Sequence, residues 1–148
     1  MPEEEPIERA HEDEREGKSP STQAGEFVRE EMEHIREGEH GARSPEQAIA
    51  IGLSKARRAG VKLPPPRRGK PRTKRQAKRD LTKGRGRRKK PSTKRSRATK
   101  RALKREGRRS ASKRALSKHA RRAASRRSAR SRSAAAKKAA RTRKRRRR

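Results

Sequence analysis

The residues that could do chemistry in this sequence are the lysines and arginines of its second half. Residues 61–148 hold 42 Lys and Arg against only Asp80 and Glu106, so this segment carries a net charge of +40. Such side chains bind phosphate, and the planar guanidinium of Arg suits bidentate contact. Duplex nucleic acid carries one negative charge per roughly 1.7 Å of axis, so this charge matches roughly 70 Å of duplex.

The phosphate-binding residues predicted from the sequence are all cations of this tail. They are Lys78, Arg79, Lys83, Arg85, Arg87, Arg88, Lys89, Lys90, Lys100, Arg101, Lys104, Arg105, Lys113, Arg114, Lys118, Arg121, Arg122, Arg126, Arg127, Lys137, Lys138, Arg143, Lys144, Arg145, Arg146, Arg147 and Arg148. The chain's single aromatic residue, Phe27, lies outside the tail. The sequence therefore does not support base stacking of the single-strand or RNA-recognition type. It also contains no cysteine–histidine finger, so sequence-specific recognition is not expected.

Other reactive residues lack the spacing or the scaffold that catalysis requires. We expect no catalytic residue, no cofactor and no metal site, and we interpret the chain as non-enzymatic. His34 and His40, with Glu33 and Glu37 nearby, could be imagined as metal ligands, but the sequence favours surface polar residues there. The chain has no cysteine, which excludes a disulfide framework and a thiolate metal site.

The composition predicts a mostly disordered chain with a short α-helical hairpin. Hydrophobic residues make up 24% of the 148 residues, and the formal net charge is +34. Ordering the backbone costs about 1–2 kcal/mol per residue, and this composition offers little apolar surface to offset that cost. Ala and Arg in the tail favour helices, whereas like charges four residues apart oppose them. We therefore expect nascent tail helices that form on binding.

Charge and proline content divide the chain into four predicted segments. Residues 1–20 form an acidic disordered arm, 21–62 a helical hairpin, 63–72 a Pro-rich linker, and 73–148 the disordered basic tail that binds nucleic acid. A flexible arm tethered to the tail would have a high effective concentration and would compete weakly with phosphate. The alternative is that the arm only aids solubility.

Capping patterns predict the two helices of the hairpin. Residues 44–47 form a capping box with proline at the first helical position, and Gly60 suits a left-handed C-terminal cap. Ser21 or Thr22 is expected to cap the preceding helix, which runs to about Glu37 and is followed by Gly38. The small apolar face of the hairpin leaves two alternatives open. The hairpin is either a marginal unit that only anchors the tail, or a surface for self-association or partner docking. The side chains that could mediate self-association are Phe27, Met32, Ile35, Ile49 and Leu53.

Residues 44–54 carry a Ser-x-x-Gln-Ala-Ile-Ala-Ile-Gly-Leu-Ser motif. With its flanks, from Phe27 to Pro66, this stretch resembles a family of small, basic, largely uncharacterised bacterial proteins, some of which are labelled DNA-binding or plasmid-stabilisation proteins. The tail resembles linker-histone and bacterial histone-like tails in composition. The resemblance implies a bacterial source and is compatible with binding to DNA.

These features together predict a sequence-nonspecific DNA-binding, nucleoid-associated protein of histone-like type, which acts by neutralising phosphates. Double-stranded DNA is the favoured partner, and the alternative is an RNA- or ribosome-associated basic protein. No apolar stretch approaches the roughly 20 residues of a membrane span, and the acidic start is unlike a signal peptide. We therefore expect a cytoplasmic, nucleoid location and no membrane span.

Overall fold

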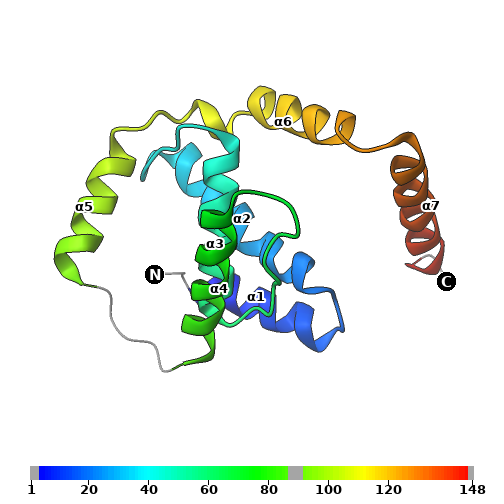
Figure 1. Ribbon diagram of the computed structural model, residues 1–148, viewed down its shortest axis with the longest axis horizontal. Helices are drawn as coiled ribbons and strands as arrows, with labels where there is room; N and C mark the ends of the chain where they lie inside the picture. Colours follow the sequence, from blue (N-terminus) through cyan, green and yellow to red (C-terminus); the bar gives the residue numbers. More distant parts are fainter. Residues whose placement is uncertain (1–3, 87–91, 147–148) are drawn as a thin grey trace. The chain divides into compact units, whose positions relative to one another are not determined.

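The computed structural model describes residues 4–86 and 92–146, which fold into helices joined by loops (Figure 1). The helices are α1 (Glu4–Arg15), α2 (Pro20–Glu37), α3 (Pro45–Ala59), α4 (Pro71–Arg85), α5 (Thr93–Lys104), α6 (Lys113–Ser125) and α7 (Ala129–Arg146), with a 3₁₀ turn at Arg109–Ala111. Two compact units are present, Met1–Ser112 and Lys113–Arg148. In the first unit α2 packs against both α1 and α3, and α4 packs against α3.

The expectation of a mostly disordered chain is wrong, because helices account for most of the described residues. Helices α4 to α7 are formed in the basic tail itself, so the expectation of nascent, binding-induced helices is wrong as well. Ala, Lys and Arg are among the strongest helix formers, and long cationic side chains carry their charges out into water, where repulsion is weak. The core also relies on small residues that let helices approach closely, such as Ala24, Ala48 and Ala56, all fully buried.

The acidic arm is a helix rather than a flexible segment. Ala10 of α1 is 4% exposed and belongs to the same core cluster as Phe27 of α2. The guanidinium Nε of Arg9 lies 2.9 Å from Oε2 of Glu26 on α2. These contacts hold α1 against α2. The prediction of a disordered arm is therefore wrong, and the flexible tether needed for competition with phosphate is absent.

Helix α3 has the caps that its sequence predicts. The Ser44 hydroxyl accepts a hydrogen bond from the Gln47 amide at 3.3 Å, and Pro45 occupies the first helical position. The Gln47 side chain reaches back one residue further than expected, because its Oε1 accepts from the Arg43 amide at 2.7 Å. Gly60 has φ 110°, in the left-handed region, so the predicted C-terminal cap is confirmed.

Helix α2 begins slightly earlier than predicted. Ser19 is the N-cap residue and Pro20 starts the helix, whereas the sequence favoured Ser21 or Thr22 as the cap. Proline suits the first helical turn because its fixed φ is helical and its missing N–H would have no partner inside the helix. The helix ends at Glu37, and Gly38 caps it with φ 86°, so the predicted end is confirmed.

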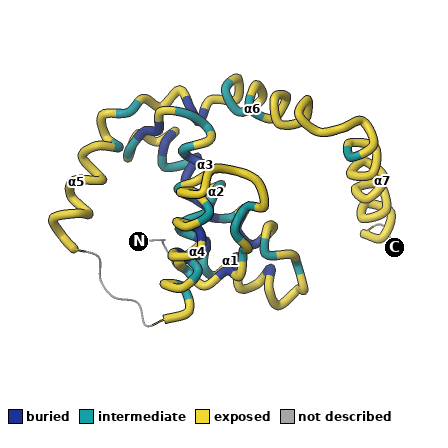
Figure 2. Tube along the Cα trace, in the orientation of Figure 1, coloured by how far each residue is buried: buried dark blue, intermediate teal, exposed yellow. Residues whose placement is uncertain are grey.

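The apolar face of the hairpin is largely covered within the chain (Figure 2). Phe27 and Ile35 are 0% exposed and Met32 is 7% exposed, while Ile49 and Leu53 are half-buried. Helix α1 supplies part of this cover, as does the segment after α3, through Val61 of the core cluster. Three of the five side chains considered for self-association therefore have little or no surface to offer a second chain.

Two glycines allow the close helix contacts of the first unit. A Cβ atom on Gly52 of α3 would lie 2.7 Å from the Cα atom of Val28 on α2. A Cβ atom on Gly84 of α4 would overlap the carbonyl oxygen of Arg57 on α3. A larger residue at either position must push its helix away from the neighbour. Gly84 thus sets how closely α4 docks.

Replacing Gly84 is expected to weaken this docking. Gly84→Ala should lower the free energy of unfolding by about 1–3 kcal/mol, the usual cost of overpacking, as measured by urea unfolding followed by circular dichroism. Gly25→Ala is the matched control, because nothing lies within 4 Å of a Cβ atom there; this change should raise stability by about 0.5–1 kcal/mol. Unchanged stability of Gly84→Ala would contradict the close α3–α4 contact.

The second unit consists of two solvent-exposed helices. Neither α6 nor α7 buries a residue, and their lysines and arginines are exposed over the part that the structure describes. Across residues 4–86 and 92–146, no helix is long and apolar enough to cross a bilayer, as expected from the sequence.

Candidate nucleic-acid interface

Helix α4 separates a buried face from a cationic one. Its Ala77 and Asp80 are 3% and 2% exposed, and α4 packs against α3. The other side carries exposed cations spaced three and four residues apart, which places them on one face of the helix. We call this row the α4 cationic stripe; it consists of Arg72, Arg75, Arg79 and Lys83.

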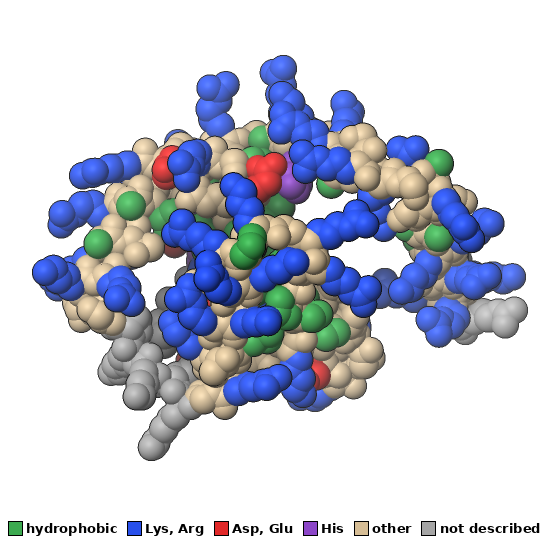
Figure 3. All heavy atoms as spheres, in the orientation of Figure 1, with side chains coloured by type: hydrophobic (Ala, Val, Ile, Leu, Met, Phe, Trp, Pro, Cys, Tyr) green, Lys and Arg blue, Asp and Glu red, His purple; other side chains and the backbone are tan. Residues whose placement is uncertain are grey.

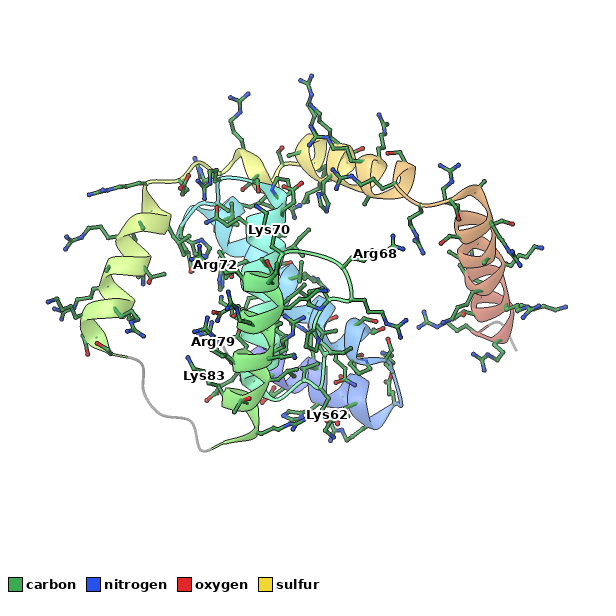
Figure 4. The ribbon with its side chains drawn as sticks, viewed as in Figure 1. Lys62, Arg68, Lys70, Arg72, Arg79 and Lys83 are labelled. Atoms are coloured by element: carbon green, nitrogen blue, oxygen red, sulfur yellow. The ribbon has the colours of Figure 1, made fainter. Side chains whose placement is uncertain are left out.

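The figures show this stripe directly. Arg72, Arg79 and Lys83 project from the same side of α4 (Figure 4), and Lys and Arg side chains gather along the helix in the space-filling view (Figure 3). An α-helix rises 1.5 Å per residue, so the row from Arg72 to Lys83 spans about 16 Å. That length corresponds to roughly ten phosphate charges of duplex DNA.

A buried carboxylate holds α4 in this orientation. Asp80 Oδ2 accepts a hydrogen bond from the Ser54 hydroxyl of α3 at 2.8 Å, and its Oδ1 accepts from the Gln76 side-chain amide at 3.1 Å. The guanidinium of Arg58 lies 3.9 Å from Oδ1. Asp80 is thus engaged on the inner side of the helix, so it does not neutralise the outward-facing stripe.

The loop between α3 and α4 is fixed by a buried guanidinium. Arg57 is 8% exposed, and it donates from Nε to the Leu63 carbonyl at 3.1 Å and from Nη2 to the Pro64 carbonyl at 3.2 Å. Burial lowers the pKa of this guanidinium from its ordinary value, and the negative charge of Asp80 opposes the shift. Arginine remains charged in proteins at all ordinary pH values, so the loop is held by charge-assisted bonds.

This loop carries four exposed cations of its own, Lys62, Arg67, Arg68 and Lys70. Figure 4 labels three of them, Lys62, Arg68 and Lys70. Lys62 lies 3.5 Å from a carboxylate oxygen of Glu14. The Pro-rich segment turns the chain back, so that Pro71 begins a helix lying against α3. Its prolines therefore help to position the first cations of α4.

Every predicted phosphate-binding residue that lies within the described residues is exposed. Those outside helix α4 are distributed over three helices and the loops that follow them. Arg87, Arg88, Lys89, Lys90, Arg147 and Arg148 lie outside the described residues. On α4 itself Arg79 and Lys83 belong to the stripe, whereas Lys78 and Arg85 project from a different side of the helix.

Sequence reasoning missed part of the α4 stripe. Arg72 and Arg75 were not among the predicted sites, although Pro71 before them is a recognisable helix start. Counting back from Lys83 in steps of four, four and three reaches Arg79, Arg75 and Arg72. That helical spacing is the signal that could have identified them.

Two metal-binding candidates from the sequence lie in a different environment from the one expected. The side chains of His34 and His40 are 11% and 14% exposed, so the interpretation as surface residues is wrong. They are covered because the loop after α2 folds back over the end of that helix. Glu33 forms an ion pair with Arg29 at 3.2 Å, and the carboxylate near both histidines is instead Glu31.

Comparison with known proteins adds one similarity of limited extent. Residues 20–67, about a third of the chain, match the model of a family of unknown function (DUF6496). This match covers α2, α3 and the start of the loop that leads to α4, and the matched family carries no assigned activity. No curated protein and no solved structure matches the chain.

Proposed function

We propose that this chain binds double-stranded DNA without sequence preference, as a nucleoid-associated protein of the cytoplasm. The observation that carries the proposal is the α4 cationic stripe, which faces solvent while the carboxylate of Asp80 is engaged on the opposite side. Helices α5, α6 and α7 carry further exposed cations. Their number exceeds what the acidic residues of the tail could neutralise.

The proposed binding energy comes from phosphates rather than from bases. Cations that neutralise phosphates release condensed counterions, and this gain requires no base contacts. Base recognition would call for side chains such as Asn or Gln aimed into a groove, but Gln76 of α4 is engaged with Asp80 and Arg79. The residues facing outward along the stripe are Arg and Lys, which fit phosphate oxygens.

The α4 stripe is tested by removing its charge. A variant with Arg72→Gln, Arg79→Gln and Lys83→Gln should reduce the slope of log K against log salt by about 2.7, since each phosphate contact on duplex DNA contributes about 0.9. Fluorescence anisotropy with random-sequence duplexes measures the slope. Binding should weaken equally on all sequences, because phosphate contacts carry no sequence information.

The matched control removes the same charge elsewhere. Arg15→Gln, Arg29→Gln and Arg43→Gln change three exposed cations on α1, α2 and the α2–α3 loop, and this variant should keep the wild-type slope. Equal changes in both variants would exclude the stripe as a contact surface. A duplex RNA of the same length, measured in parallel, tests the partner: tighter binding to RNA than to DNA would overturn the choice of DNA.

A further inference from the structure

A group of potential metal ligands lies at the end of α2, away from the α4 stripe. Glu31 and His34 are three residues apart on the helix, so they share a face, and His40 comes from the loop that follows the Gly38 cap. One ligand atom from each of the three residues lies within 4.8 Å of the other two. Sequence spacing alone could not place His40 here, because the loop must fold back to bring it to the helix.

The carboxylate of Glu31 is buried to an unusual degree. Its side chain is 0% exposed, and neither of its oxygens has a hydrogen bond of acceptable geometry. Lys55 Nζ lies 2.8 Å from Oε2, at ion-pair distance but outside hydrogen-bond angles. A buried carboxylate is costly unless other groups compensate its charge, and Oε1 faces His40 rather than Lys55.

The ring of His40 presents a nitrogen to this carboxylate. Its Nδ1 lies 3.2 Å from the Gly41 carbonyl oxygen, and a carbonyl can only accept, so Nδ1 carries the proton. The other nitrogen, Nε2, is then a lone-pair donor in the neutral ring, and it lies 3.2 Å from Glu31 Oε1. Two electron-pair donors at this distance repel each other unless a proton or a metal ion lies between them.

We propose that Glu31, His34 and His40 bind a divalent transition-metal ion, and that Zn²⁺ fits the site. Bonds of about 2.0–2.1 Å from Zn²⁺ to nitrogen and oxygen in a tetrahedron place the ligand atoms about 3.3 Å apart, close to the 3.2 Å between Glu31 Oε1 and His40 Nε2. Side-chain rotation within the 4.8 Å group brings in His34. Two imidazoles and one carboxylate leave a fourth position for water.

The surrounding charges favour a cation. Two buried carboxylates lie near the ammonium of Lys55, Glu30 at 3.8 Å and Glu31 at 2.8 Å. The ion binds Oε1 of Glu31 while Lys55 remains on Oε2. Oε2 of Glu39 lies 3.9 Å from Nδ1 of His34, so a further carboxylate lies near the group.

Metal binding would also fix the loop that contacts the tail. The amide of Gly41, next to His40, donates to the Leu103 carbonyl at 2.9 Å, and the Ala42 amide donates to the Gly107 carbonyl at 3.1 Å. An ion held by His40 would therefore fix the neighbouring residues Gly41 and Ala42, which donate these two hydrogen bonds. The site couples α2 to the segment from Leu103 to Gly107 of the tail through a short loop.

Zinc titration of the full-length chain tests the proposal. After treatment with a chelator and desalting, Zn²⁺ is added in competition with a chromophoric chelator, with excess Mg²⁺ to block weak acidic sites. The expected result is one site per chain, and a rise in Tm of about 5–10 °C at Zn²⁺ a hundredfold above Kd. Affinity should fall on acidification, because protons compete with the metal ion for its ligand atoms. Absence of a one-to-one site would overturn the proposal.

Variants locate the site. His34→Gln and His40→Gln should each weaken Zn²⁺ binding at least about tenfold, whereas His11→Gln, a control on the exposed face of α1, should bind as the wild type does. Histidine resonances of the wild-type chain give an answer that does not depend on variant folding. Zn²⁺ should shift those of His34 and His40 and leave His11 in place; shifts confined to other histidines would refute the assignment.

Discussion

Raising the salt concentration from 50 to 200 mM is expected to weaken binding of random duplex DNA to the full chain at least about 10³-fold. Six to ten phosphate contacts already produce a loss of about 10³–10⁵ over this range, and the chain carries a net charge of +34. The effect arises because salt reduces the entropy gained when condensed counterions leave the DNA. Anisotropy titrations at four or five salt concentrations measure it.

A truncated chain that ends at Ser112, measured in the same way, separates the contributions of the two units to DNA binding. It lacks 18 of the 51 Lys and Arg but keeps every residue of the first compact unit. Its slope against log salt should be shallower than that of the full chain but not zero, because the α4 cationic stripe is retained. Affinity independent of salt, or confined to one DNA sequence, would contradict phosphate neutralisation.

The parts of the fold that sequence predicted are those decided by neighbours along the chain. Ser44, Pro45 and Gly60 mark the ends of α3 because capping depends on a few adjacent residues. Gly38 marks the end of α2 for the same reason. In each case the local requirement is strong, and tertiary contacts reinforce it rather than override it.

Tertiary packing decided what the sequence could not. The acidic arm contains few large apolar residues, yet Ala10 completes the core around Phe27. Glycine weakens the interior of a helix, but Gly84 lies within α4 and allows contact with Arg57. Composition counts apolar side chains and does not register how closely small residues let helices approach.

The cluster of Glu31, His34 and His40 at the end of α2 could not be predicted from the sequence either. The sequence paired the histidines with Glu33 and Glu37, which lie close to them along the chain. The structure buries Glu31 because Lys55 of α3 faces it, and this partner lies 24 residues away in the sequence. Charge pairing between helices depends on how they dock, which no local pattern encodes.

Removing the ammonium of Lys55 is expected to destabilise the first unit strongly. Lys55→Met should lower the free energy of unfolding by about 3–5 kcal/mol, the range for breaking a buried ion pair. The carboxylate of Glu31 is 0% exposed, and it would stay buried without this cation. Domains are stable by only about 5–15 kcal/mol, so urea unfolding of the chelator-treated chain resolves this loss.

Replacing both charges should restore most of that stability. The double variant Glu31→Leu, Lys55→Met leaves no buried carboxylate at position 31, and apolar replacement of a whole buried pair is often neutral. Arg29 and Glu33 provide the matched control on α2, since this pair is 66% and 47% exposed; Arg29→Met should cost under about 0.5 kcal/mol. If Lys55→Met cost no more than this control, the buried pair would not be what holds α2 and α3 together.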